Sequence, residues 1–199
     1  MKPTIPDWLQ RLLARPVAVF GGGVSGTSAA NLVQRLGGKA IVFDETFANV
    51  AECRFTSVEA KTHALVVVSP GFAPGHAWLQ AARSAGCEVL AEIDFAALAW
   101  PGRIVAVTGT NGKTTITEFL TSALRLAGRD AHAAGNIGMP LSEVAATGMG
   151  DESSIAVCEV SSFQAELLRF FEADTTIWSN FSEDHLDRHG TIEDYFRAK

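Results

Sequence analysis

Residues 103–115 read Arg-Ile-Val-Ala-Val-Thr-Gly-Thr-Asn-Gly-Lys-Thr-Thr, and this stretch decides the fold. A β-branched apolar run, a glycine turn and a helix-forming segment follow one another, which predicts a strand, a tight loop and the start of a helix. Glycines let the backbone fold around phosphate oxygens, and the N–H groups at a helix start point at an anion. The stretch therefore predicts a phosphate-binding loop in an α/β fold.

The residue types in this loop predict that it binds ATP with Mg²⁺. Lys113 would neutralise the β- and γ-phosphates, and the Thr114 hydroxyl would ligate the metal. Val107 stands where the usual GxxxxGK[ST] pattern has its first glycine, so only the shorter GTNGKT form is met. The alternative is an ordinary strand–helix turn with an exposed lysine. The predicted ATP-binding residues are Gly109, Thr110, Asn111, Gly112, Lys113, Thr114 and Thr115.

Short β-branched runs alternate with longer helical segments along the rest of the chain. This alternation indicates βαβ units in a mostly parallel sheet with both faces covered, which is the α/β class. The expected strands cover residues 17–21, 40–43, 65–69, 104–108, 155–159 and 175–179. The expected helices cover residues 25–36, 74–85, 92–100, 113–127, 163–171 and 192–199.

A second glycine-rich turn follows the first expected strand. Gly21, Gly23 and Gly26 match GxGxxG, and Asp44 ends the next strand about 20 residues later, which is typical of a Rossmann-like nucleotide-binding unit. The motif by itself is weak, because a plain strand–helix packing turn has the same spacing. An NAD-dependent oxidoreductase also fits this turn, but it leaves the loop at Lys113 unexplained. The Ser69–Gly71 segment is a third candidate loop or an ordinary turn.

Pro101-Gly102 separates the two glycine turns and predicts two units. Residues 1–100 would form a Rossmann-like domain, and residues 101–199 the first part of a P-loop ATPase-type parallel-sheet domain. Thr191 reads as the N-cap of a helix with only about two turns before Lys199, so we expect the chain to be part of a longer protein. An exposed sheet edge would then favour self-association.

Composition narrows the class of protein. Hydrophobic residues make up 47% and charged residues 19%, which favours a folded chain, and a net charge of -6 offers no basic field for nucleic acid. Cys53, Cys87 and Cys158 form no CxxC pair, so a reducing compartment is expected. The absence of a signal peptide and of a long apolar run predicts a cytoplasmic chain without a membrane span.

Polar residues after two later strands are further site candidates. Glu159 ends an apolar strand where a second magnesium ligand is needed, although it also favours the next helix start. Ser161 and Gln164 have the spacing of a capping box. His185 and His189 are four residues apart, but the HExxH zinc pattern is absent. Asn136, in Gly-Asn-Ile-Gly, sits in a plain turn or beside a diphosphate.

The segments GTNGKTT, GNIG, EVSSFQ and NFSEDHLDRHG, in this order, closely resemble the Mur ligase family over nearly the whole chain. The first glycine turn, the Ser-Pro-Gly loop and the GNIG segment resemble the branch that adds D-glutamate to UDP-N-acetylmuramoyl-L-alanine in peptidoglycan synthesis. The resemblance implies an ATP-dependent amide ligase acting through an acyl phosphate. It also implies that the chain acts in the cytoplasm and that its partners are small-molecule substrates. We expect a monomer.

The resemblance also implies roles for individual residues. Lys113, Glu159 and His185 would be catalytic, and the metal ligands would be Thr114, Glu159, His185 and Lys199. Lys199 falls where the family has a carbamylated lysine, but an unmodified exposed lysine is the simpler expectation here. The UDP-substrate would contact Gly23, Val24, Ser25, Gly26, Asp44, Glu45, Gly71, Asn136, Ser161, Gln164 and His185.

The resemblance implies that family members continue with the rest of the central domain and a C-terminal amino-acid-binding domain, and we expect residues 1–199 to stop before both. We therefore expect no ligase activity from this chain alone. The alternatives are a UDP-sugar-binding module without catalysis, another Mur ligase, and an NAD-dependent oxidoreductase. A folylpolyglutamate-synthase-like ligase shares the ATP loop, but the GxGxxG unit in front argues against it.

Overall fold

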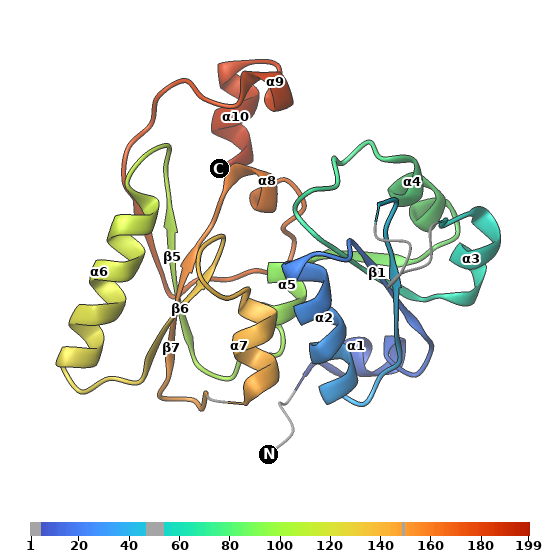
Figure 1. The fold of residues 1–199 in the computed structure, drawn as a ribbon, viewed down its shortest axis with the longest axis horizontal. Helices are drawn as coiled ribbons and strands as arrows, with labels where there is room; N and C mark the ends of the chain where they lie inside the picture. The colour runs from blue at the N-terminus through green and yellow to red at the C-terminus, as the bar shows by residue number, and fades with distance from the viewer. Residues whose placement is uncertain (1–4, 47–53, 149) are drawn as a thin grey trace.

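The computed structural model describes residues 5–46, 54–148 and 150–199, which form two parallel four-stranded sheets (Figure 1). The strand orders are β2-β1-β3-β4 and β6-β7-β5-β8, and every named strand pair is parallel. The predicted α/β class is confirmed. The strands are β1 Val17–Phe20, β2 Ala40–Phe43, β3 Leu65–Val68, β4 Glu88–Ala91, β5 Arg103–Thr108, β6 Ala131–Gly135, β7 Ile155–Glu159 and β8 Thr175–Trp178.

Helices cover the faces of both sheets. In the second sheet, α6 lies on one face and α7 on the other (Figure 1). The helices are α1 Asp7–Leu12, α2 Val24–Arg35, α3 Ser57–Thr62, α4 Ala77–Ser84, α5 Glu92–Ala97, α6 Lys113–Leu126, α7 Leu141–Thr147, α8 Ser162–Ala165, α9 Leu186–His189 and α10 Ile192–Ala198.

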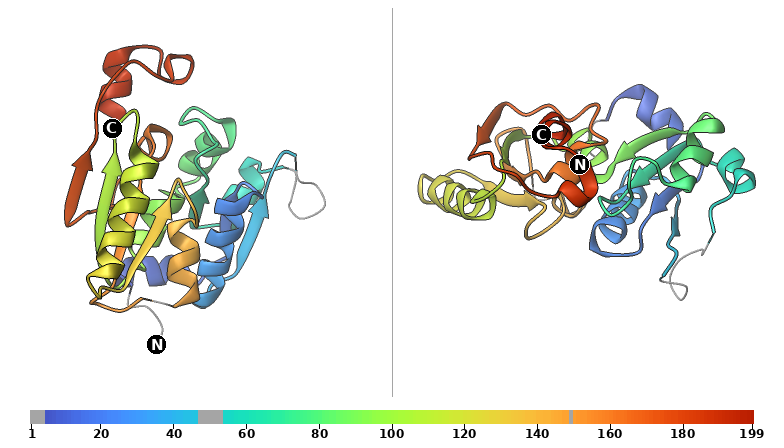
Figure 2. Two further views of the ribbon diagram at one scale, coloured as in Figure 1. Left: turned by 60° about the vertical axis from the view of Figure 1, so that its left-hand side comes forward. Right: turned by 90° about the horizontal axis from the view of Figure 1, so that it is seen from above.

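The two sheets lie side by side and share one hydrophobic core (Figure 2). Helix α2 of the first half packs against α7 of the second, and α5 packs against both. The core therefore runs from Val19 in β1 through Phe95 in α5 to Ala134 in β6. This packing holds the two sheets, and with them the carboxyl ends of their strands, in a fixed orientation to each other.

Two strands of the structure had no clear signal in the sequence. Strand β6 contains three alanines, a histidine and a glycine, which are poor strand formers. Its pairing with β7, with Ala131 opposite Ile155 and Gly135 opposite Glu159, makes it a strand. Strand β4 is short and similarly depends on pairing with β3. Tertiary pairing overrides local propensity here.

The predicted helix over residues 163–171 was wrong beyond Ala165. The carboxylate of Asp94, in α5, accepts hydrogen bonds from the backbone N–H groups of Arg169, at 3.2 Å, and Phe170, at 2.8 Å. Those amides therefore satisfy a distant side chain instead of the carbonyls one turn earlier. Helix α4 also begins later than predicted, because the His76 ring accepts from the Trp78 N–H and caps it.

Two of the cysteines lie within the described residues. Cys87 and Cys158 are buried free thiols, and burial raises the pKa of each. Cys53 lies outside the described residues. Among the helices that the structure describes, none is long and apolar enough to cross a membrane.

Glu92 is a buried carboxyl at the junction of the two halves. Its Oε1 accepts the backbone N–H of Ser142, at 2.9 Å, and the Ser142 hydroxyl, while Oε2 has no partner among the described residues. Burial raises the pKa of Glu92 above its ordinary value, and the two bonds from Ser142 offset only part of that effect. Folding therefore makes the charged form of Glu92 less favourable than it is in the unfolded chain.

We expect Glu92→Gln to stabilise the chain at neutral and higher pH. A raised carboxyl pKa means that the folded state binds the proton more tightly, so the wild type loses stability as the pH rises from about 4.3 through the folded pKa. The free energy of unfolding of the variant should exceed that of the wild type by about 1 kcal/mol or more at pH 8, and the two should be equal near pH 4. Urea unfolding across this range measures it, with the exposed Glu152→Gln as the control. A variant less stable at every pH would contradict the prediction.

Candidate functional site

The loop between β5 and α6 makes a tight turn on two glycines. Gly109 has a φ of 128° and Gly112 a φ of 80°, a region that disfavours side chains. A Cβ at Gly112 would meet open space, whereas one at Gly109 would lie 2.9 Å from the Asn180 carbonyl oxygen. The loop thus packs on the segment after β8 at Gly109 and leaves open space at Gly112.

Two lysine ammonium groups converge on this loop. Lys113 Nζ donates to the carbonyls of Gly109, at 3.0 Å, and Thr110, at 2.7 Å. Lys199, from the end of α10, donates to the same Gly109 carbonyl at 2.7 Å. The predicted phosphate loop therefore carries two positive charges, one from each end of the second sequence half.

Glu159 organises the neighbouring strand end. It is 2% exposed; its Oε2 accepts from Thr114 Oγ1 at 2.7 Å, and its Oε1 accepts from Asn136 Nδ2 at 2.8 Å. The three residues meet because β5, β7 and β6 are adjacent and parallel, so their carboxyl ends share one edge. The hydroxyl and carboxylate oxygens are the ligand types that Mg²⁺ prefers.

Lys199 is not the plain exposed lysine that was expected. Its side chain is partly buried, and its Nζ also lies 3.4 Å from Thr108 Oγ1 and 5.2 Å from the Tyr195 ring centre. Desolvation, followed by the neighbouring Lys113 charge, lowers the pKa of Lys199 to about 8, although Asp184 and Glu159 act in the opposite direction. A neutral amine is therefore available near physiological pH.

We expect Lys199 to react with an amine-directed acylating reagent at lower pH than an ordinary lysine. Its rate should reach half of its maximum near pH 8, whereas an unperturbed lysine titrates near 10.4. Peptide mapping by mass spectrometry across pH 6–11 measures this, with the exposed Lys39 as the internal reference. Parallel pH profiles for the two lysines would contradict the prediction.

Other predicted residues lie elsewhere. His185 has a φ of 51°, and its Nε2 is 3.5 Å from Asp184 Oδ2; its ring packs 4.9 Å from that of Phe163. Among the described residues, no contact joins His185 to Thr114 or Glu159. His189 instead bonds Ser162 and pairs with Glu166. No group of three or more His, Cys, Asp or Glu side chains within the described ranges is placed to hold a metal.

Ser161 and Gln164 form the predicted capping box at the start of α8. Ser161 Oγ accepts the Gln164 N–H at 3.2 Å, and Gln164 Oε1 accepts the Ser161 N–H at 3.0 Å. Gln164 also borders a small cavity with Ser69 and Pro70 from the loop after β3. Gln164 of the second half and the Ser-Pro-Gly loop of the first half thus border the same small cavity.

The first glycine turn lies at the carboxyl end of β1. The Asp44 carboxylate accepts the Gly22 N–H at 2.6 Å and the Thr46 N–H at 2.7 Å, which fixes the ends of β1 and β2 to each other. Val24 is exposed and begins α2, followed by the half-buried Ser25. Gly71 and Gly23 both face open space. Glu45 is near His76, at 3.7 Å.

Arg188 is a further site candidate whose only sequence signal was its place within NFSEDHLDRHG. Its guanidinium donates to both carboxylate oxygens of Glu166, at 3.2 Å and 3.3 Å from Nε, and to the Phe72 carbonyl at 3.2 Å. It also lies 4.7 Å from the Phe163 ring centre. Arg188 therefore ties the segment before α10 to the loop after β3.

The fold and the loop at Lys113 together define an α/β protein with a glycine-rich loop between a parallel strand and a helix. Residues 107–199 match the Mur ligase middle domain, and the chain belongs to the Mur ligase family.

Two relatives are named UDP-N-acetylmuramoylalanine–D-glutamate ligase. That of Desulfotalea psychrophila is 37% identical over 198 residues, covering 92% of this chain and 43% of the relative. That of Protochlamydia amoebophila is 33% identical over 208 residues, covering 96% and 46%. The chain thus spans less than half the length of these relatives.

Solved structures support the fold. The UDP-N-acetylmuramate:L-alanyl-γ-D-glutamyl-meso-diaminopimelate ligase of Neisseria meningitides superposes with a TM-score of 0.58 at 16% identity, over 92% of this chain and 67% of the other. The murein peptide ligase of Psychrobacter arcticus gives the same TM-score at 21% identity, over 92% and 46%. At these identities the likeness concerns the fold alone.

Proposed function

We propose that this chain is the UDP-substrate-binding and ATP-binding part of a ligase that joins D-glutamate to UDP-N-acetylmuramoyl-L-alanine. The observation that carries the proposal is the grouping of Lys113, Thr114 and Glu159 at the carboxyl ends of two adjacent parallel strands. The names of the relatives at 33–37% identity supply the substrates.

The proposed division of labour follows the two sheets. Residues 1–100 would bind the UDP carrier at the carboxyl ends of β1 to β3, where Gly23 leaves open space at the start of α2. Residues 101–199 would bind ATP on the Gly109–Thr115 loop. Gln164 borders a small cavity with Ser69 and Pro70, and Arg188 donates to the Phe72 carbonyl of the loop after β3. These two residues would place the muramoyl-alanine end between the two halves.

The proposed chemistry brings two anions together. The substrate carboxylate attacks the γ-phosphorus of ATP, the bond to the bridging oxygen breaks, and ADP leaves; the amine of D-glutamate then displaces phosphate from the acyl phosphate. Lys113 would neutralise the phosphate oxygens as charge moves to the leaving group. Thr114 and Glu159 would hold Mg²⁺, which supplies Lewis-acid charge stabilisation when bound.

Lys199 and His185 complete the proposed metal and substrate contacts. The lowered pKa of Lys199 supplies the neutral amine that carbamylation by carbon dioxide requires, and the product is a carboxylate beside the phosphate loop. His185 is half-exposed with its ring against Phe163, so it is open to a metal or substrate that enters between α8 and α10.

We expect the purified chain to bind UDP-N-acetylmuramoyl-L-alanine more tightly than UDP-N-acetylmuramate, since only the alanyl compound reaches the contacts around Gln164. Calorimetric titration with each compound, and with NAD as a comparison, measures this. The preference should be at least about fivefold, as for one added hydrogen bond of about 1 kcal/mol. Binding of NAD with indifference to both UDP compounds would overturn the proposed function.

A further inference from the structure

Large aromatic side chains gather on the exposed surface beside α10, beyond the carboxyl ends of the second sheet (Figure 1). Trp178 ends β8, Phe181 follows it, and Phe196 lies in α10; each of these residues is more than a third exposed. Their ring centres lie 5.3, 5.7 and 6.3 Å apart. Single exposed apolar residues are normal, whereas a contiguous group of large ones marks an interaction surface.

A hollow of about 310 Å³ opens beside this cluster. It is lined by Phe181 and by two exposed pairs from α10, the apolar pair Ile192 and Phe196 and the charged pair Glu193 and Arg197. The members of each pair are four residues apart, so each pair forms a stripe along the helix. Tyr195 and Lys199 point the other way, toward the phosphate loop. The outer face of α10 is therefore separate from the proposed ATP site.

The charged stripe of α10 carries one charge of each sign. Among the described residues, neither Glu193 nor Arg197 forms an ion pair. An antiparallel copy of α10, related by a twofold axis near residues 194–195, brings Glu193 of each copy opposite Arg197 of the other. The same operation brings Ile192 opposite Phe196. A second copy of the chain therefore supplies both the apolar and the charged match to this face.

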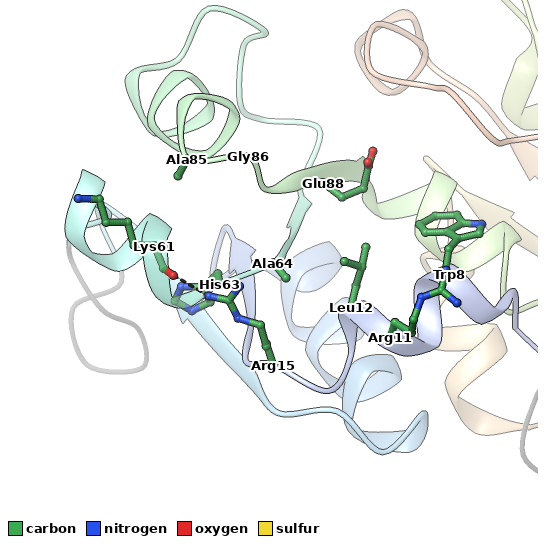
Figure 3. A pocket seen from close by; sticks show the side chains of 10 residues that line it. All are labelled: Trp8, Arg11, Leu12, Arg15, Lys61, His63, Ala64, Ala85, Gly86 and Glu88. Atoms are coloured by element: carbon green, nitrogen blue, oxygen red, sulfur yellow. Dashed lines mark hydrogen bonds between the residues drawn. The ribbon is translucent and has the colours of Figure 1, made fainter.

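A larger hollow in the first half does not have this self-complementary pattern. It has a volume of about 380 Å³ and lies at the amino ends of β3 and β4 (Figure 3). Arg11 and Arg15 point to its opposite ends in Figure 3, and its one acidic lining residue, Glu88, is already paired with Arg169. Because no unpaired acidic group lies beside these arginines among the lining residues, the hollow does not match a second copy of itself.

We propose that two copies of this chain associate through α10, with the two helices antiparallel. Phe196 of each copy would enter the hollow of the other beside Phe181, and two Glu193–Arg197 pairs would flank the aromatic contact. Aromatic residues and arginine are enriched in protein interfaces. Because the patch is small, the dimer should be weak, and the monomer expected from the sequence would be the dilute form. The proposal does not depend on the proposed ligase function.

Sedimentation equilibrium of the purified chain, from about 10 μM to about 1 mM, tests the association. The mean mass should rise with concentration toward twice that of one chain. Phe196→Ser removes the exposed ring and should weaken association at least about tenfold. Thr176→Lys, on the edge strand β8, is the control and should change the affinity less than about twofold. Loss of association in Thr176→Lys without an effect of Phe196→Ser would assign the contact to the sheet edge and contradict the proposal.

Two charge variants test the antiparallel pairing. Glu193→Arg leaves only positive charges in the stripe and Arg197→Glu only negative ones, so each variant alone should associate at least about tenfold more weakly than the wild type. An equimolar mixture of the two restores opposite charges and should recover the wild-type affinity within about threefold. Glu152→Arg makes the same charge change at an exposed site elsewhere and controls for net charge. A wild type that stays monomeric up to about 1 mM, or a mixture that associates no more strongly than its components, would overturn the proposal.

Discussion

Replacement of Gly26 by alanine is expected to destabilise the chain more than any other single methyl addition in the first glycine turn. A Cβ at Gly26 would overlap the carbonyl oxygen of Gly21 and lie 2.8 Å from its carbonyl carbon. Both are main-chain atoms of the turn after β1, so no side-chain rotation relieves the contact. Overpacking of this kind costs about 3 kcal/mol or more.

Thermal unfolding measures the effect, with Gly23→Ala as the matched control from the same turn. A loss of about 3 kcal/mol corresponds to a fall of about 6–12 °C in Tm for a chain of this size. Gly23 has a φ of -75° and open space around the position of its Cβ, so its variant should stay within about 1 kcal/mol of the wild type. Equal Tm values for the two variants would refute the assigned packing role of Gly26.

The Gly23→Ala variant also separates folding from binding. In the dinucleotide turn, the second glycine lets a diphosphate approach the backbone, and the third lets the helix approach the strand. Only the Gly26 role follows from contacts in this structure. If Gly23 faces the UDP diphosphate as proposed, its variant should fold normally and bind the UDP compound at least about tenfold more weakly in calorimetry.

Replacement of Lys113 by alanine is expected to remove most of the ATP affinity while leaving the fold intact. Among the described residues, the Nζ makes hydrogen bonds only to the Gly109 and Thr110 carbonyls, which can turn to water when the amine is absent. The bound triphosphate would lose a charge-assisted partner worth about 2 kcal/mol or more, so its affinity should fall at least about thirtyfold.

Calorimetric titration with ATP and Mg²⁺ measures this loss, and Lys39→Ala is the control for removal of one exposed positive charge. Lys39 lies in the turn before β2, away from both glycine loops. Its variant should bind ATP within about twofold of the wild type, because exposed charges beyond about 10 Å are screened. Full ATP affinity in the Lys113 variant would contradict the assignment of the Gly109–Thr115 loop.

The local patterns of the sequence predicted much of the second sheet. The run Arg103–Thr108 became β5, and the helix after the Lys113 loop begins at Lys113 itself. The capping box of Ser161 and Gln164 was also predictable, since it depends on residues three apart. Strand β6, with its alanines, was not, because its formation depends on pairing with β7.

The candidate site divides in the same way. The glycine loops and the acid at the end of β7 were visible as residue types at fixed spacings. The contacts that join them were not: Asn136 to Glu159, Lys199 to the Gly109 carbonyl and Arg188 to the Phe72 carbonyl each link distant segments. Such contacts depend on strand order and helix packing, which no local pattern encodes.

By itself, the sequence determined the α/β class, the two glycine turns and their order along the chain, because backbone conformation at glycines and short β-branched runs is a local property. Only the tertiary structure decided that α8 stops at Ala165 and that Lys199 lies half-buried against the phosphate loop. Each of these outcomes depends on burial and on contacts with residues far away in the sequence. The free energies of such contacts exceed those of local secondary-structure preferences.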